Sequence, residues 1–479
     1  MRAGPRGRVS GLGVSAPIRP QVLRLHANET NTGFFYALNA THLFGQYGEA
    51  EFQLSSRVPF VESFDAGQSW QPAAQSTPSC SLSGAAWQSV CFQNALVPLT
   101  SGGFYSLQGN GPLWGGPSVS ESAPPWTNFS SPWRAQYAAT GAGGSLNMAV
   151  RNEGVVFGGI PEERAVWPLC STGGLFERSI FTYAVVAHPS SDEVVAAVLL
   201  CDSPHTKQLW GTAAEPTNLS APSLVAFASP ADGSGNWSYR GVIMDARMMV
   251  PQDTVRGLTG EAALAVLADG KTLVAIVRTD GDCTCGMARV GPGQQPECGI
   301  YRYYYQAYSA DGGRSWSKPR PIRGAGCVRP HLLSFGGLAG GGLVLSGGRI
   351  CVENMTGLFI WHNPDGLADH AGIGDGSEWQ RHSITYWHNR LWKGETAYKF
   401  DERVNVSNLF ESQAYTGLIP LGKSEDGNGQ DFMVTYNRYW DPLFDGMPGC
   451  DGTDGNGLGC STGFGMQVTI DTISSEPTL

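Results

Sequence analysis

The 479-residue sequence has no apolar run near the roughly 20 residues that a membrane-spanning helix requires. Charged residues are also scarce, at 15% of the chain, and the formal net charge is −10. A chain with an excess of acidic groups repels phosphate backbones and anionic lipid surfaces. We therefore expect neither a general nucleic-acid partner nor direct insertion into a membrane.

The first 17 residues, MRAGPRGRVSGLGVSAP, lack the apolar core of a signal peptide, although they are basic. Other features indicate the secretory route, because the chain has 11 cysteines and seven Asn-x-Ser/Thr sequons. The sequons begin at Asn28, Asn39, Asn128, Asn218, Asn236, Asn354 and Asn405. The expectation is a secreted or lumenal glycoprotein with disulfides whose N-terminus is incomplete, and a cytosolic protein is the alternative.

The sequence shows little sign of a metal or cofactor site. Cys450 and Cys460 flank the stretch DGTDGNGLG, whose Asp and Gly residues suggest either a Ca²⁺ loop or an ordinary surface loop. The spacing fits no EF-hand, which favours the surface loop. We expect neither a metal nor a cofactor.

The residues that are abundant are those of turns and strands: 64 Gly, and 10% aromatic residues with 14 Trp among them. The stretch ALAVLADGKTLVAIVR places a turn at Asp269-Gly270 between two apolar runs, which predicts a hairpin. The aromatic run YRYYYQAYS and the segment WSKPRPI follow it. Residues 262 to about 322 therefore form four antiparallel strands in series.

The same pattern restarts twice, first with PHLLSF, GGLVLSGGR, TGLFIWHN and WQRHSITYW, then with YTGLIPL and DFMVTYNRY. Repeated four-stranded units are typical of a β-propeller. The prediction is an all-β propeller over 19–479, with one or two blades and insertions between about 71 and 225. Residues 1–18 are expected to be an N-terminal segment, either disordered or truncated.

An eight-residue frame occurs twice, as SFDAGQSW from Ser63 and as SADGGRSW from Ser309, and PADGSGNW from Pro230 is a degenerate copy. The Asp and Ser side chains are suited to bind the backbone of a turn, and Gly allows a positive φ. The frames are predicted to be structural turns between third and fourth strands, on the outer rim.

The frames resemble the Asp boxes of the sialidase (neuraminidase) family, whose members are six-bladed β-propellers. The resemblance extends to the order of a Glu, a hairpin, an Arg and an Asp box, which here are Glu261, Arg278 and the frame at Ser309. It also includes ESQAYTGLIPL, which contains Tyr415. It covers the chain well from about residue 260 onward and only loosely over the first 230 residues.

The resemblance implies a retaining glycosidase with Tyr415 as nucleophile and Glu261 as its base. A sialoside carries a carboxylate beside its anomeric carbon, and a guanidinium binds such a group through two parallel hydrogen bonds. A neutral Tyr avoids repulsion by that carboxylate but needs a base, since its reference pKa is about 10. Glu261 lies at the start and Arg278 at the end of one hairpin, where its two strand ends are neighbours. Both are therefore expected to face the centre. Each of the three residues also has a plainer interpretation: Glu261 as a solvated loop residue, Arg278 as a surface residue and Tyr415 as a core residue.

The remaining carboxylate-binding arginines are less well defined. Arg19 in IRPQVLRL stands where the family has its first Arg, without the intervening apolar residue. At the position that corresponds to the family's third Arg, this sequence has Met355 and no Arg. Arg349 in LSGGR is the favoured substitute, and Arg329 in CVRPHLL is the other candidate.

The family's general acid has no counterpart, because no Asp occurs between Arg19 and Asp65. The acids in this region are Glu29, Glu49, Glu51 and Glu62. Either a Glu replaces the Asp, or a divergent loop supplies the acid, or hydrolysis is lost. The sequence thus predicts an enzyme that removes terminal sialic acid or a related nonulosonic acid from sialylated or other acidic glycans. A propeller that binds acidic glycans without turnover, and a structural or protein-binding propeller, are the alternatives.

Overall fold

The computed structural model shows a β protein, with few helical residues among those that it describes. It describes residues 12–13, 31–37, 41–48, 60–72, 96–98, 104–107, 134–139, 146–151, 156–158, 181–200, 223–231, 236–245, 248–249, 257–280, 303–326, 329–335, 342–348, 357–364, 366, 379–394, 396–400, 416–424, 429–439 and 461–471.

The described strands form six sheets, five with four strands and one with five. The first contains β2 (Asn31–Ala37), β3 (Leu43–Gly48), β4 (Phe60–Ser63) and β5 (Gln71–Pro72). The second contains β6 (Leu96–Pro98), β7 (Phe104–Leu107), β8 (Arg134–Ala139) and β9 (Leu146–Arg151). The third contains β10 (Val156–Gly158), β11 (Phe181–His188), β12 (Glu193–Leu200), β13 (Ser223–Pro230) and β14 (Asn236–Asp245).

The other three sheets occupy the second half of the chain. The fourth contains β15 (Gly257–Val266), β16 (Leu273–Asp280), β17 (Tyr303–Ser309) and β18 (Arg320–Gly326). The fifth contains β19 (His331–Ser334), β20 (Leu343–Gly348), β21 (Leu358–Asn363) and β22 (Gln380–Ser383). The sixth contains β23 (Gly417–Lys423), β24 (Gly429–Tyr439), β25 (Ser461–Asp471) and β1 (Leu12–Gly13).

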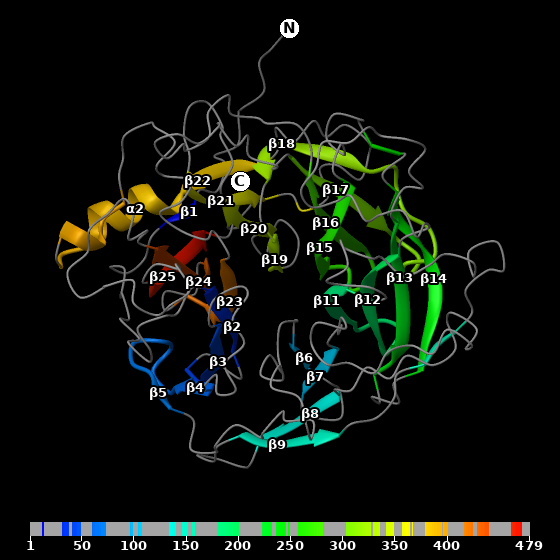
Figure 1. Cartoon of the computed structure of the whole chain (residues 1–479), viewed down its shortest axis with the longest axis horizontal. Helices are drawn as coiled ribbons and strands as arrows, with labels where there is room; N and C mark the ends of the chain where they lie inside the picture. The colour runs from blue at the N-terminus through cyan, green and yellow to red at the C-terminus, as the bar shows by residue number, and fades with distance from the viewer. Residues whose placement is uncertain are drawn as a thin grey trace, which may run out of the picture.

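The sheets are arranged around a common centre, and β2, β6, β11, β15, β19 and β23 lie nearest to it (Figure 1). Contacts join β6 to β11, β11 to β15, β15 to β19, β19 to β23, and β23 to β2. Except for the β10–β14 pair, which is parallel, all strand pairs described are antiparallel. The strands predicted from about 262 to 322 are confirmed as β15 to β18.

Each sheet has two distinct ends, because its successive strands reverse direction. The innermost strand starts and the second strand ends at one end, which we call the first-strand end; the turn after the third strand lies at the other, the frame end. Neighbouring sheets share this orientation. At the first-strand end the Ser346 and Thr416 hydroxyls lie 2.7 Å apart. At the frame end His188 Nε2 lies 2.8 Å from the Lys271 carbonyl oxygen.

The core lies between the faces of neighbouring sheets. Tyr304 of the fourth sheet meets Trp361 of the fifth edge to face, with ring centroids 6.1 Å apart. The indole N–H of Trp361 also donates to the carbonyl of Gly324, at 2.9 Å. Both rings are almost completely buried. Apolar area removed from water in this way is the main stabilising term of such a fold.

The two complete copies of the frame connect the third and fourth strands of their sheets, as predicted. In the second copy the Ser309 hydroxyl accepts from the Gly313 N–H at 2.8 Å, and Asp311 Oδ1 accepts from the Ser315 N–H at 2.9 Å. The first copy repeats both bonds, from Gly67 to Ser63 and from Ser69 to Asp65, each at 2.8 Å. Identical contacts explain why the same residues recur.

The frames also pack against the neighbouring sheet. A Cβ added to Gly313 would lie 3.3 Å from the Cβ of Ala226 in β13. At Gly67 it would lie within 2.4 Å of the end of the Met433 side chain in β24. Gly313 and Gly67 have φ values of 88° and 84°, a backbone conformation that residues other than Gly rarely adopt. Glycine at this frame position thus meets two demands, a left-handed turn and close contact between sheets.

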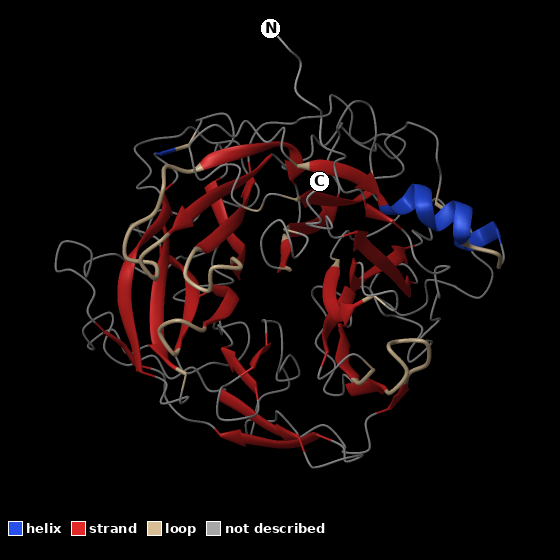
Figure 2. Cartoon of the chain, turned by 180° about the vertical axis from the view of Figure 1, so that it is seen from behind, coloured by secondary structure: helices blue, strands red, loops and turns tan. Residues whose placement is uncertain are grey.

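Two local predictions need correction. The stretch WQRHSITYW is not a single strand, because β22 ends at Ser383 and helix α2 (Ile384–Leu391) begins there (Figure 2). Ser383 caps this helix, and its hydroxyl accepts from the Tyr386 N–H at 3.2 Å. The 3₁₀ helix η5 (Thr396–Tyr398) follows α2. The third sheet is not purely four-stranded and antiparallel, since β10 pairs with β14 in parallel.

Candidate active site

The hairpin of β15 and β16 positions the first pair of candidate residues. Its turn forms at Asp269 and Gly270, as predicted: Asp269 Oδ1 accepts from the N–H groups of Lys271 and Thr272 at 2.9 and 2.8 Å. Gly270 takes a φ of 67°. Burial opposes the ionisation of Asp269, but the hydrogen bonds from Thr272 and Lys271 lower its pKa below the ordinary value. A fixed turn sets the register along the whole hairpin.

Glu261 and Arg278 are in direct contact at the first-strand end of this hairpin. Arg278 Nη1 donates to Glu261 Oε2 at 2.6 Å. Glu261 lies where the pairing of β15 with β16 is irregular, between Leu258 and Ala262. Such irregularities redirect side chains and are frequent next to active sites. Both residues belong to the strands nearest the centre or directly beside them (Figure 1).

The Glu261–Arg278 pair is nearly removed from solvent, with exposed fractions of 8% and 4%. Taking two charges out of water is costly, and a buried pair is therefore weak evidence of a purely stabilising role. A guanidinium held in place by a carboxylate is, however, well suited to bind an anionic ligand group through its remaining N–H groups. The pair thus places a carboxylate oxygen and a fixed cation side by side.

Arg329 lies at the same end of the neighbouring sheet, two residues before the start of β19, and is 6% exposed. The strands β15 and β19 are in contact. The pKa of His331 lies well below its ordinary value because of burial and of the Arg329 cation nearby. His331 is thus a neutral imidazole at neutral pH, beside a cation. The structure brings Arg329, Glu261 and Arg278 to the same end of adjacent sheets.

Tyr415, Arg349 and Arg19 lie outside the described residues, as do the 11 cysteines. Residues close in sequence to Tyr415 and to Arg349 are described, whereas those around Arg19 are not. Thr416 directly follows Tyr415 and is buried; Ser346 stands three residues before Arg349 and is buried too. Sequence reasoning missed the hydrogen bond between these two hydroxyls, which joins β20 to the residue before β23. Its one signal in the sequence was a polar residue inside the apolar strand GLVLSGG.

Glu62 is placed away from the pair formed by Glu261 and Arg278. It belongs to β4, is 2% exposed, and directly precedes Ser63 of the first frame. Its Oε1 lies 3.7 Å from His42 Nε2. The end of the third strand is the frame end, opposite to the end that holds Glu261. Of the four glutamates considered as a general acid, Glu62 is therefore at the wrong end of its sheet, and Glu29, Glu49 and Glu51 lie outside the described residues.

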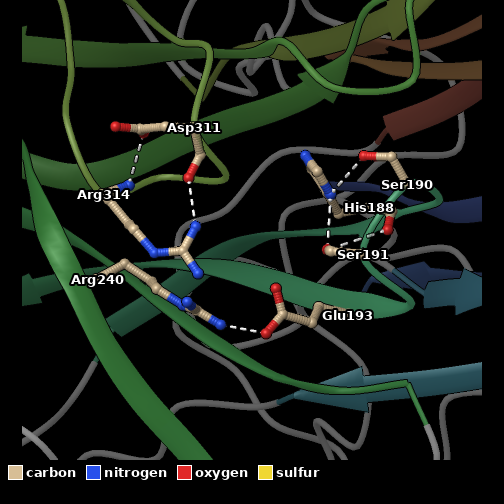
Figure 3. Close-up of polar contacts among 7 residues, drawn as sticks. All are labelled: His188, Ser190, Ser191, Glu193, Arg240, Asp311 and Arg314. Atoms are coloured by element: carbon tan, nitrogen blue, oxygen red, sulfur yellow. Dashed lines mark hydrogen bonds and ion pairs between the residues drawn. The ribbon is translucent and has the colours of Figure 1, made fainter.

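The frame end carries its own polar contacts at the junction of the third and fourth sheets (Figure 3). His188 Nδ1 lies 2.8 Å from the Ser191 hydroxyl, and its Nε2 donates to the Lys271 carbonyl at 2.8 Å. Arg240 forms an ion pair with Glu193, and Arg314 Nη1 donates to the Asp311 carbonyl at 2.7 Å. Of these contacts, the one from His188 to Lys271 joins the two sheets, and the others lie within the third sheet or within the frame turn.

Within the described ranges, no group of three or more His, Cys, Asp or Glu side chains is placed to hold a metal ion. In the same part of the chain, no helix has the length and apolar character needed to cross a membrane.

No family model and no curated protein matches this sequence. A solved structure of a protein of unknown function from Dyadobacter fermentans is similar, with a TM-score of 0.50 and 12% identity. The match covers 94% of this chain and 97% of that one. At this identity the likeness concerns the fold alone.

Two sialidase structures also match, at lower TM-scores. The sialidase of Trypanosoma rangeli, in complex with the inhibitor DANA, has a TM-score of 0.45 and 9% identity over 97% of this chain. The chain spans 60% of the length of that protein. The intramolecular trans-sialidase from Ruminococcus gnavus has a TM-score of 0.41 and 12% identity, covering 94% of this chain and 98% of that one. The comparisons thus establish a shared fold, that of the Dyadobacter fermentans protein.

Proposed function

We propose that the protein is a sialidase-like glycoside hydrolase, in which the six sheets are the blades of a closed propeller and the frames are Asp boxes. Its substrate is a glycan that ends in sialic acid or a related nonulosonic acid. The observation that carries this proposal is the buried contact between Glu261 and Arg278, at 2.6 Å. Two residues chosen from sequence for a shared site meet at the centre-facing hairpin.

The carboxylate of the sugar acid would bind to arginines. Arg278 is fixed by Glu261, and Arg329 lies at the same end of the next sheet; Arg349 and Arg19 complete the proposed set. A guanidinium stays charged at any physiological pH and matches a carboxylate in shape. These properties favour an anionic sugar over a neutral one.

The chemical step would be a double displacement. The Tyr415 oxygen attacks the anomeric carbon while its proton passes to the Glu261 carboxylate, and the bond from that carbon to the aglycone oxygen breaks. The aglycone oxygen takes up a proton from a general acid, whose residue the sequence leaves open. Water then attacks the anomeric carbon and passes a proton to the conjugate base of that acid, while the Tyr415 oxygen leaves and takes back the proton held by Glu261. Two inversions give retention of anomeric configuration.

The test is release of a fluorogenic aryl aglycone from a sialoside. An aryl oxide leaves without strong acid assistance, so the assay remains informative even if the general acid is weak. Tyr415→Phe removes the nucleophilic oxygen and is expected to lower turnover by several orders of magnitude, on the scale seen when a nucleophile is deleted. Glu261→Gln is expected to be nearly as damaging. Tyr386→Phe, at an exposed tyrosine of α2, is the matched control.

A 3-fluorosialyl fluoride should label the wild-type protein at Tyr415, as peptide mapping would show. Label at another residue, or normal turnover in Tyr415→Phe, would refute the mechanism. A wild-type protein that binds sialosides but does not turn them over would refute hydrolysis, and the protein would then be a binder of acidic glycans.

A further inference from the structure

The contact between Ser346 and Thr416 is unusual for its surroundings. Their hydroxyl oxygens lie 2.7 Å apart, and the two residues are 0% and 2% exposed. Ser346 faces the sixth sheet from within β20, a strand whose residues are all buried. A buried hydroxyl that loses its partner leaves the other without compensation for lost water. Each residue therefore fixes the other, and with it the spacing of β20 and the start of β23.

The end of β20 is also fixed from the opposite side. A Cβ added to Gly347 would lie 2.2 Å from the hydroxyl oxygen of Tyr304 in β17. Tyr304 is fully buried, so neither group has room to move away. The end of β20 is thus packed between Tyr304 of the fourth sheet and Thr416 of the sixth.

The residues that follow in sequence give this contact its meaning. Ser346 precedes Arg349 by three residues, and Thr416 is bonded directly to Tyr415. We propose that the hydrogen bond between Ser346 and Thr416 is a positioning contact of the reaction: it sets the distance between the nucleophile and the arginine that binds the substrate carboxylate. This inference rests on the proposed function. Neither hydroxyl is proposed to touch the substrate.

The energetic reason lies in the geometry of attack. The substrate is anchored by its carboxylate, while Tyr415 must reach a carbon directly beside that group. A displacement of about 1 Å between anchor and nucleophile is enough to reduce rates by about 100-fold. Because Arg349 follows β20 in sequence and Tyr415 precedes β23, contacts between the fifth and sixth sheets influence their separation. The Ser346–Thr416 bond is such a contact at the first-strand end.

The test is the kinetics of Thr416→Val, which preserves shape and removes the hydroxyl. Turnover is expected to fall by roughly 10- to 100-fold, with KM changed by less than about threefold, because anchoring persists while the nucleophile is misplaced. Thr416→Ser keeps a hydroxyl and should restore most of the turnover. Labelling by the 3-fluorosialyl fluoride should slow in parallel. Ser346→Ala should act like Thr416→Val, and the double variant should be no worse than the more damaged single one.

Thr469→Val is the matched control. Thr469 is also buried in the sixth sheet and its hydroxyl donates to Asp431 at 2.6 Å, but it lies toward the frame end. The Thr469→Val variant should have a lower melting temperature and unchanged turnover per folded molecule.

Wild-type turnover in both Thr416→Val and Ser346→Ala would overturn the inference and leave the proposed function standing. Equal losses of turnover in Thr469→Val would overturn it too, since the effect would then be general loosening. If Thr416→Val fails to fold, Ser346→Ala decides the question. If the wild type neither turns over nor labels, the proposed function fails and this inference fails with it.

Discussion

At the scale of single residues, Arg278 contacts the Glu261 carboxylate and is also proposed to bind the substrate carboxylate. Removing one member of a buried ion pair typically costs about 3–5 kcal/mol, because the other charge is left uncompensated. Arg278→Ala would thus mix a folding defect with a binding defect. A substitution that keeps the positive charge separates the two.

Arg278→Lys is expected to raise KM for a sialoside at least about tenfold, equivalent to about 1.4 kcal/mol of binding free energy. The reason is that an ammonium cannot form the two parallel hydrogen bonds of a guanidinium. The check is to compare the sialoside with its neutral methyl ester in a binding assay. The preference for the acid should shrink in the variant. Equal weakening of both ligands would mean that Arg278 supports the fold and not the ligand.

The site residues differ in how well the sequence could predict them. Glu261 and Arg278 stand at the ends of two apolar runs that a clear Asp-Gly turn joins, so local pattern alone made them neighbours. The bond from Ser346 to Thr416 joins different sheets 70 positions apart, and a lone hydroxyl in a strand carries no signature of its partner. The end at which Glu62 lies depends on strand direction within a sheet, which became certain only in the structure.

At the scale of elements, the frame is a turn in which the Asp side chain accepts hydrogen bonds from backbone N–H groups. Asp311 accepts from the N–H groups of Arg314 and Ser315 at 3.0 and 2.9 Å and from the Ser309 hydroxyl at 2.8 Å. Burial is the largest single influence and opposes its ionisation, but the bonds from Ser315, Ser309 and Arg314 together lower its pKa. The turn keeps the third and fourth strands aligned.

Asp311→Ala is expected to destabilise the protein by roughly 1–3 kcal/mol, the usual cost of leaving hydrogen-bonding groups unpaired. Turnover by the folded fraction should be nearly unchanged, because the frame end lies opposite to the proposed site. Chemical unfolding and a sialoside assay on the same sample would check both statements. A large loss of turnover at full stability would give the frame a direct part in catalysis.

The element that sequence reasoning mistook is α2. Its residues Ile384, Thr385 and Tyr386 have β-branched or aromatic side chains, which favour strands. Ser383 settled the outcome as a cap, and burial of Ile384, His388 and Asn389 stabilises the helix through tertiary contacts. Hairpins were predicted correctly because their turns and strands are adjacent in the chain. Helix α2 was not predicted, because it is stabilised by residues of the sixth sheet that are distant in sequence.

At the scale of the whole molecule, His388 couples the junction of the fifth and sixth sheets to pH. It is fully buried among Trp392, Phe400, Tyr436 and Phe464. Its Nε2 donates to the Tyr398 carbonyl at 3.0 Å, so its Nδ1, 2.9 Å from the Tyr436 hydroxyl, is the acceptor. Burial above all, together with the Arg438 and Lys399 cations, lowers the pKa of His388 to about 4, against the opposing effect of the hydrogen bond to Tyr398.

The folded protein therefore keeps His388 neutral while an unfolded chain protonates it near pH 6.5. Stability from this residue is complete above pH 6.5, declines as pH falls from 6.5 toward 4, and changes no further below that. The decline is about 3 kcal/mol at most. Urea unfolding from pH 7 to pH 4 should show a steeper loss in the wild type than in His388→Gln. Parallel curves would place the acid sensitivity elsewhere.

The joining of β1 to β25 has a mechanical consequence. Leu12 pairs with Ile470 and Gly13 with Thr469, in antiparallel orientation. When force is applied across residues 12 and 470, such a pair is loaded like a zipper and its hydrogen bonds break one after another, whereas strands loaded in shear must break theirs together. The covalently connected sheets would still be intact when this pair gives way. Stretching is therefore expected to detach β1 from the sixth sheet at low force, before any hairpin is extended and while β2 still contacts β23.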